Sequence, residues 1–334
     1  MHILVYEYLT GGGEKGALSP AMTLEGEHML RGLVSDLLSI PAVTLTVVRD
    51  DRLPPIDLQN GRLRIQPISS SESPLAFLRE QRHPVDAVWP IAPETNGCLE
   101  AICREIEAEG KTLLTTSSEG VALMGRKLQT LRVLEHAGVP VVASAWLENI
   151  GDWQTFAYPL VFKRNDGAGC EDTIIIQNTA EKDAFLKTHT LENWIAQPLV
   201  EGDALSLSGL FCKGRGQLLS CNRQQMVRDH QGFYLSGITV NAIEDVTGLF
   251  RSLLSQVASA LPALWGFAGI DFVLDDTGPK VLEVNPRLTS AYTGIRAATG
   301  LNPAAMVLDL AKSSTLPSLP SPDINPVELR WSLG

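Results

Sequence analysis

The sequence lacks several features that mark whole classes of protein. It has no basic run, and its 334 residues carry 27 Lys+Arg against 38 Asp+Glu, a net charge of −11. This balance argues against nucleic acid or an anionic membrane as the main partner. Its five cysteines form no CxxC pair and no zinc-finger spacing, so we expect reduced thiols in a cytoplasmic protein.

Long apolar runs are also scarce. The N-terminal MHILVYEYL has no basic segment and is interrupted by Glu7, which argues against a signal peptide. The uncharged stretch 252–270 contains Pro262 and several polar residues, so we interpret it as a buried helix, a turn and the start of a strand. We therefore expect small-molecule partners and no membrane.

The apolar content of 44% is enough for a buried core, and the length suggests about two domains. In the first third, strand and helix signals alternate, which predicts βαβ units and a parallel sheet ending near residue 115. The expected strands are 3–6, 43–48, 87–91 and 113–115, and the expected helices are 24–38, 75–81 and 99–106.

The middle of the chain changes character. A helix over 119–137 is followed mainly by strands, which predicts an α+β region built from antiparallel sheets. The expected strands are 160–163, 173–177, 194–198, 204–211 and 217–223, and a helix (246–261), a hairpin (269–285) and a last helix (304–311) follow. From residue 313 the Ser- and Pro-rich tail should be extended on the surface.

The segment GIDFVLDDTGPKVLEVNPR carries the strongest local signal. Two apolar runs flank DDTG, which is turn chemistry, so the segment predicts a β-hairpin. A three-residue loop over 276–278 would pair Asp275 with Pro279 and would set Asp271 directly opposite Glu283.

Asn285 lies two residues beyond Glu283 and should share its face of the strand. Opposed carboxylates repel each other and need a proton or a cation between them. Two carboxylates and an amide oxygen suit Mg²⁺ or Mn²⁺. The alternative is a hairpin whose polar face is simply hydrated. Lys280 should point to the other face.

Lysines and glycines supply candidate phosphate contacts. Lys163 ends a strand and precedes a loop with Gly167 and Gly169, an arrangement that can hold phosphate oxygens but is also that of a plain hairpin turn. Lys127, near a helix start, is by itself an ordinary solvated lysine. The segment 197–202 could read an adenine edge through its backbone, or simply connect two strands.

Taken in order, these features resemble the ATP-grasp superfamily of ATP-dependent carboxylate–amine ligases. GIDFVL and LEVNPR carry the resemblance, which covers residues 1–312. EYLTGGG, APET, CNRQ and VNPRLTSAYTG are most similar to the tyramine–glutamate ligase group, which makes γ-glutamyl amides in methanofuran-type cofactor biosynthesis.

The resemblance implies a fold and its division. An α/β pre-ATP-grasp domain over 1–115, with a parallel sheet, would precede a two-subdomain ATP-grasp fold with antiparallel sheets. The small subdomain would cover 116–200, the C-terminal subdomain with the metal site 201–314, and an extended tail 315–334. A homodimer is expected by analogy.

The resemblance also implies roles for individual residues, with ATP and Mg²⁺ (or Mn²⁺) as cofactors. Because Ala204 stands where an acid that binds ribose is common, Glu201 or Asp203 would substitute for it. The implied ATP-binding residues are Lys127, Lys163, Gly167, Gly169, Gln197, Val200, Glu201 and Asp203; the metal ligands are Asp271, Glu283 and Asn285; Arg223 and Arg287 would face the transferred phosphoryl group.

We expect the acceptor substrate at the carboxyl ends of the first strands, where open α/β sheets bind ligands. The residues expected there are Tyr6, Glu7, Gly12 and Glu94. The predicted reaction joins glutamate to tyramine or a tyrosine-like amine through an acylphosphate. The alternatives are another amino-acid or peptide-type ATP-grasp ligase, or a non-catalytic ATP-binding regulator.

Overall fold

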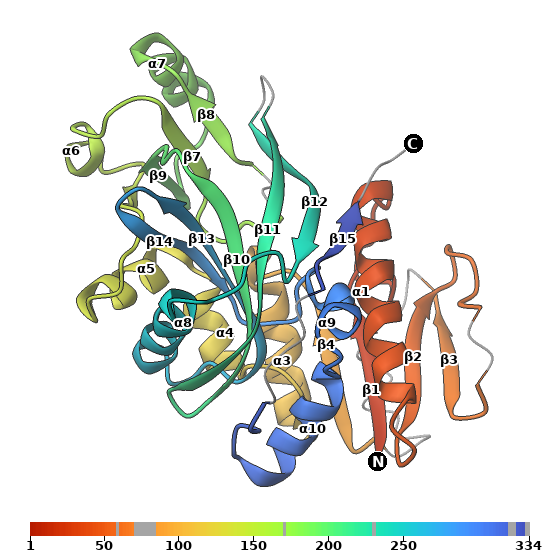
Figure 1. The fold of residues 1–334 in the computed structure, drawn as a ribbon. Helices are drawn as coiled ribbons and strands as arrows, with labels where there is room; N and C mark the ends of the chain where they lie inside the picture. The colour runs from red at the N-terminus through yellow and green to blue at the C-terminus, as the bar shows by residue number, and fades with distance from the viewer. Residues whose placement is uncertain (58–59, 70–84, 170–171, 229–231, 320–324, 331–334) are drawn as a thin grey trace.

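The computed structural model describes residues 1–57, 60–69, 85–169, 172–228, 232–319 and 325–330. These residues contain a five-stranded, a four-stranded and a six-stranded sheet, arranged as in Figure 1. The first sheet is parallel and the other two are antiparallel. The predicted fold class is therefore confirmed.

The first sheet has the order β3-β2-β1-β4-β5. Its strands are β1 (His2–Glu7), β2 (Thr44–Asp50), β3 (Leu63–Ile68), β4 (Ala87–Ile91) and β5 (Thr112–Leu113). In β1, Ile3 and Val5 share a core with helix α1 (Pro20–Leu38), whereas Leu4 and Tyr6 share one with α3 (Cys98–Ala108). The two helices thus cover opposite faces, which is why the strands are apolar throughout. β3 was not predicted, and the predicted helix over 75–81 lies outside the described residues.

The prediction of one helix over 119–137 was wrong. The structure has α4 (Ser118–Met124) and α5 (Lys127–His136), because Arg126 between them is extended. At the break, a side chain on Gly125 would meet the Val121 carbonyl at 3.0 Å and Glu94 at 3.3 Å. The interruption makes Lys127 the first residue of a helix.

The four-stranded sheet has the order β6-β9-β7-β8. Its elements are β6 (Ala145–Trp146), α6 (Ile150–Trp153), β7 (Leu160–Arg164), β8 (Ile174–Ile176), α7 (Thr179–Thr188) and β9 (Trp194–Pro198). Helix α7 was not predicted because Phe185 is the one buried residue that it contributes. A capping signal was present, since Asn178 accepts the amide of Glu181 at 3.1 Å and Glu181 accepts that of Gln177 at 2.8 Å.

Phe162 is the centre of the core of this sheet. It is fully buried, and its ring lies 5.3 Å from those of Trp153 and Phe185. We expect Phe162→Ala to lower the free energy of unfolding by about 3–5 kcal/mol, measured by denaturant titration. Ile150→Ala, at a position 44% exposed, should change it little. Equal unfolding midpoints for the two variants would contradict this account of the core.

The six-stranded sheet has the order β14-β13-β10-β11-β12-β15. Its strands are β10 (Asp203–Cys212), β11 (Arg215–Arg228), β12 (Phe233–Val240), β13 (Gly266–Asp275), β14 (Gly278–Asn285) and β15 (Val327–Arg330). Helix α8 (Leu249–Ala260) packs on β10 and β13 through Leu253, Leu207 and Ile270, and α9 (Tyr292–Thr299) and α10 (Pro303–Ser313) follow β14. β12 was missed, and the predicted helix over 246–261 starts three residues later.

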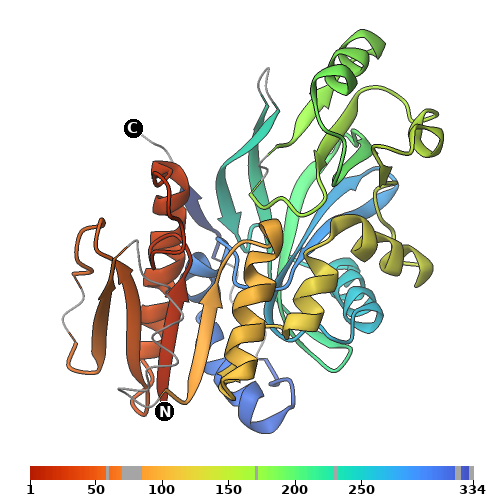
Figure 2. The ribbon, with the colours of Figure 1, turned by 180° about the vertical axis from the view of Figure 1, so that it is seen from behind.

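The C-terminal segment also departs from expectation. We expected a surface tail, but Val327–Arg330 adds to β12 as the edge strand β15 (Figure 2). The Gln225 side chain donates a hydrogen bond to Glu328 of β15 at 2.9 Å and so anchors this strand. The domain limits at 115, 200 and 314 stay predictions.

The first sheet and the six-stranded sheet share one core, which contains Leu33 of α1 and Phe267 of β13. A buried polar contact accompanies it: Asp36 of α1 accepts hydrogen bonds from the Tyr292 hydroxyl and the Arg296 guanidinium of α9, both at 3.0 Å. Figures 1 and 2 show α1 alongside α9 and β15. The C-terminal end of α1 is thereby held against α9.

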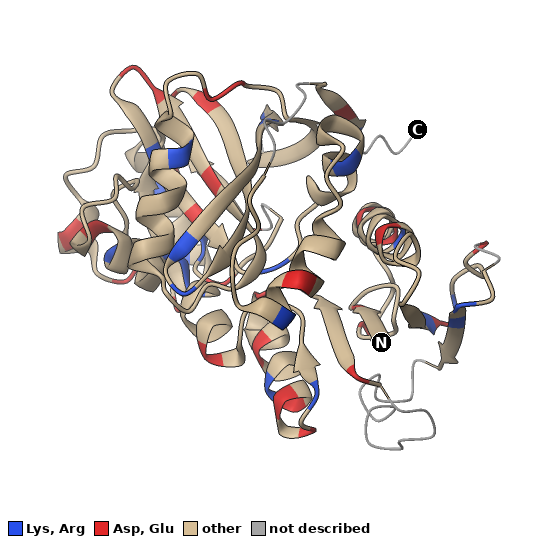
Figure 3. Ribbon diagram, turned by 60° about the horizontal axis from the view of Figure 1, so that its bottom comes forward, with Lys and Arg blue, Asp and Glu red and all other residues tan. Residues whose placement is uncertain are grey.

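Over the described ranges, none of the helices has the length and apolar character needed to cross a membrane. Residues 252–270 form most of α8, a turn and the start of β13, as predicted. The four described cysteines are free thiols, and Cys170 lies outside the described residues. Figure 3 shows Lys and Arg positions scattered over several elements.

Candidate active site

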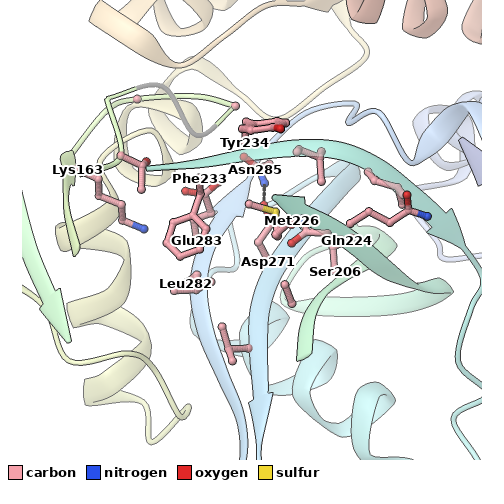
Figure 4. Close-up of a pocket in the computed structure, with 18 of the residues that line it drawn as sticks. Lys163, Ser206, Gln224, Met226, Phe233, Tyr234, Asp271, Leu282, Glu283 and Asn285 are labelled. Carbon is pink, nitrogen blue, oxygen red and sulfur yellow. Dashed lines mark hydrogen bonds between the residues drawn. The ribbon is translucent and has the colours of Figure 1, made fainter. Parts of the chain in front are cut away.

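A cavity of about 960 Å³ opens between the four-stranded and six-stranded sheets. Its lining comes from β7 and β9, from strands β10–β14, and from the start of α1. Figure 4 shows Asp271, Glu283 and Asn285 on β13 and β14, with Lys163 reaching toward them from β7. The volume suits a bound small molecule.

The turn of the β13–β14 hairpin differs from the prediction. Asp275 pairs with Gly278, so the loop has two residues instead of three. The Asp275 carboxylate accepts the Thr277 amide at 2.8 Å, which closes the tighter turn. The predicted pairing of Asp275 with Pro279 was therefore wrong.

Asp271 nevertheless lies directly opposite Glu283, as predicted. The register shifts between Asp271 and Phe272, and Leu282 is the extra residue on β14. This β-bulge restores the offset that the shorter turn removes. Two departures from the predicted register therefore cancel at the carboxylate pair.

The environments of the two carboxylates differ. Asp271 accepts hydrogen bonds from Asn285 at 3.0 Å and from Gln224 at 3.1 Å. Burial, and then the charge of Glu283, raise the pKa of Asp271. Burial alone would also raise the pKa of Glu283, but the charge of Lys127, 2.8 Å away, and then that of Lys163 lower it.

This donor set fits a hard divalent cation. Two carboxylates share one face with an amide, and burial, followed by the charge of Glu283, raises the pKa of Asp271. No group of three or more His, Cys, Asp or Glu side chains suited to a metal occurs in the part of the chain that the structure describes. The amide oxygen of Asn285 would complete a set of the kind that Mg²⁺ prefers.

The basic side of the cavity contains Lys127, Lys163, Gly167 and Gly169, all of which line it. The Lys127 ammonium donates to the Gly167 carbonyl at 2.6 Å and therefore joins α5 to the glycine loop. Burial disfavours the charge of Lys127, but Glu283 holds its pKa above the ordinary value.

Asn165, which sequence reasoning missed, fixes the start of α5. Its side-chain oxygen accepts the Leu128 amide at 2.8 Å, and its carbonyl accepts the Lys127 amide at 2.9 Å. It therefore caps a helix from a different segment of the chain. In the sequence, Asn165 directly follows Lys163 and Arg164 at the end of β7, and this position could have marked it as a candidate site residue.

The connection from β9 to β10 lines another part of the cavity, with Gln197, Val200 and Glu201 among its residues. Gln197 is buried and its amide donates to Ser144 at 2.7 Å. Gly202 permits a close approach, because a Cβ there would lie 2.5 Å from the Leu274 carbonyl.

Arg223 and Asp203, both expected at the ATP site, are not among the residues that line the cavity. The Arg223 guanidinium donates to Asp203 at 2.7 Å, and both side chains are about half exposed. The next residue along β11, Gln224, does line the cavity. Of the two residues expected near the ribose, only Glu201 lines the cavity.

Arg287 and Glu94 form a buried bidentate ion pair. The Nε and Nη2 atoms of Arg287 each donate to one Glu94 oxygen at 2.9 Å. Arg287 lines the cavity, whereas Glu94 lies behind it and is 7% exposed. Glu94 is therefore placed to hold Arg287 and, unlike the substrate contact expected of it, does not line the cavity.

The other expected substrate residues do not line the cavity either. Tyr6 and Glu7 are buried, and Glu7 accepts the amide of Thr10 at 2.7 Å. A Cβ on Gly11 would lie 2.7 Å from the Tyr6 ring, and Gly12 is buried with a φ of 78°. The small size of these glycines therefore lets the turn after β1 pack closely against the Tyr6 ring.

Ala21, Met22 and Glu25 of α1 line the cavity instead. No motif in the sequence marks them. Their position depends on how α1 packs against α9, which sequence periodicity does not reveal.

Comparison with known families agrees with this geometry. The model of the ATP-grasp domain matches residues 124–291, and that of the pre ATP-grasp 3 domain matches residues 43–121. The chain belongs to the ATP-grasp family. As an ATP-grasp enzyme it binds ATP and is an ADP-forming carboxylate–amine ligase.

Individual relatives are distant but extensive. Tyramine–L-glutamate ligase of Methanocaldococcus jannaschii is 25% identical, covering 90% of this chain and 86% of that protein. A probable α-L-glutamate ligase of Xanthomonas oryzae pv. oryzae is also 25% identical, covering 69% and 78%. An ATP-grasp superfamily protein of Archaeoglobus fulgidus superposes with a TM-score of 0.71 at 20% identity, covering 99% of this chain and 92% of that one.

Proposed function

We propose that this ATP-grasp ligase joins the carboxylate of glutamate to the amine of tyramine or a similar aromatic amine. The observation that carries the proposal is the carboxylate pair Asp271 and Glu283, which shares one cavity with Lys127, Lys163 and Arg287. Glutamate is the substrate named for the relatives from M. jannaschii and X. oryzae. The first of these also supports a place in methanofuran-type cofactor biosynthesis.

The first step activates the carboxylate. Asp271, Glu283 and Asn285 would hold Mg²⁺, which would neutralise phosphate charge during phosphoryl transfer. Lys127 and Lys163 bind phosphate oxygens in our proposal, and the glycine loop covers them. A carboxylate oxygen of the substrate attacks the γ-phosphorus, ADP leaves, and an acylphosphate forms.

In the second step, the amine attacks the acyl carbon and phosphate leaves. Arg287 lines the cavity, and in our proposal its guanidinium stabilises the oxyanion that develops. The loop around Gly167 and Gly169 would exclude water, which otherwise hydrolyses the acylphosphate. Phe233 and Tyr234 of β12 line the cavity and offer an apolar surface to an aromatic amine.

The test is ADP release with Mg²⁺ and ATP across a panel of acids and amines. We expect ADP only when glutamate and an aromatic amine such as tyramine are both present, with one amide formed per ADP. Omitting either substrate is the matched control. ADP release with a different acid and amine would replace the substrate assignment, and release with no amine would contradict amide formation.

A further inference from the structure

One carboxylate in the cavity has no part in the chemistry described above. Glu25 projects from the first turns of α1 into the lining, beside Ala21 and Met22. The hydroxyl of Ser290, in the loop after β14, donates a hydrogen bond to its Oε1 atom. Ser290 is buried, so this contact fixes where the carboxylate lies.

Glu25 lies near the reacting end of the cavity. Ser290 follows Arg287 by three residues, and the charge of Glu25 is one of those that act on Arg287. Arg287, however, directs its hydrogen bonds to Glu94 and to the Leu288 carbonyl. Among the described residues, the hydrogen-bond partner of Glu25 is thus a neutral hydroxyl, although an ionised carboxylate that is partly buried is stabilised best by a cation.

We propose that Glu25 is the counter-ion for the primary ammonium group of a substrate in this cavity. The inference rests on the proposed function, because an amide-forming ligase that acts on amino acids takes substrates that carry such a group. Two sources are compatible with the chemistry: the amine acceptor, and the α-ammonium group of the amino acid whose side-chain carboxylate is activated. The apolar side chains of Ala21 and Met22 beside Glu25 suit the carbon skeleton of either.

Glu25→Gln removes the charge but leaves an oxygen that can accept the Ser290 hydrogen bond. Glu27→Gln is the matched control, since Glu27 is on the same helix and forms ion pairs with Arg31 and Arg49 outside the cavity lining. Calorimetric titration of each protein with tyramine and with L-glutamate, in the presence of Mg²⁺ and ADP, measures ammonium binding without turnover. The N-acetyl derivatives of both ligands serve as neutral probes.

We expect Glu25→Gln to weaken one of the two ammonium ligands by about 10- to 100-fold, and Glu27→Gln to leave both unchanged. Acetylation of that ligand should weaken its binding to the unmodified protein by a similar factor and have little further effect in Glu25→Gln. The ligand that responds identifies the source of the ammonium group.

The proposal is overturned if neither ammonium ligand binds the unmodified protein, if Glu25→Gln binds both normally, or if acetylation weakens binding equally with and without the Glu25 charge. These outcomes are separate from failure of the proposed function. A protein that binds an ammonium ligand through Glu25 but releases no ADP would remove the substrate assignment alone. A protein that releases ADP with no effect of Glu25→Gln would remove this inference alone.

Discussion

Glu283→Gln is expected to lower the rate of ADP release, with both substrates present, by about 100- to 1,000-fold. Glu283 lies opposite Asp271 and contacts the Lys127 ammonium at 2.8 Å, so it joins the metal-binding side of the cavity to the phosphate-binding side. Removing its charge weakens the cation site and leaves Lys127 without its carboxylate. The Mg²⁺ concentration that gives half the maximal rate should also rise.

Asp275→Asn is the matched control for this variant. Asp275 is on the same hairpin, but it pairs with Lys280, whose contact holds the pKa of the Asp275 carboxyl well below its usual range. Neither residue lines the cavity. We expect near-normal rates and normal Mg²⁺ dependence. Normal turnover in Glu283→Gln, or equal losses in the two variants, would contradict the assignment of the carboxylate pair.

The second large effect is expected for Glu94→Gln. Breaking a buried ion pair by removing one charge costs about 3–5 kcal/mol of stability, because the other charge remains buried without its partner. Arg287 would also lose the bidentate contact that orients it in the cavity. We therefore expect a lower unfolding midpoint and a fall in kcat, with KM for the amine little changed.

Glu100→Gln serves as the comparison, since Glu100 pairs with Arg104 on the surface of α3, where loss of an ion pair costs about 1 kcal/mol or less. Steady-state kinetics and denaturant unfolding of both variants measure the difference. A raised KM for the amine at unchanged kcat in Glu94→Gln would return Glu94 to the substrate-binding role first expected of it.

The local patterns of the sequence predicted most of the strands that carry the site. The first and last residues of β4 and β9 match the expected ranges, because both strands are apolar runs bounded by turn residues. Helix α7 was missed since a single buried residue gives no apolar periodicity. The break before Lys127 was missed because Gly125 matters through its approach to Glu94, a residue of another segment.

Residue positions within the site were harder to predict than the elements. Arg223 was expected at the end of a strand, but β11 continues to Arg228, and it is the residues after Arg223, beginning with Gln224, that line the cavity. The facing of Asp271 and Glu283 was predicted correctly even though the turn was not, because a bulge at Leu282 compensates. Glu25 could not be found from sequence, since only the packing of α1 on α9 brings it to the cavity.

The central claim is that this cavity activates a carboxylate by phosphorylation. It can be tested by turnover of glutamate with both oxygens of its side-chain carboxylate labelled with ¹⁸O, followed by mass spectrometry of the released phosphate. The account predicts one ¹⁸O atom in each phosphate, because a carboxylate oxygen attacks the γ-phosphorus and stays with it when the amine displaces phosphate. Phosphate released together with amide but without ¹⁸O would contradict the acylphosphate route.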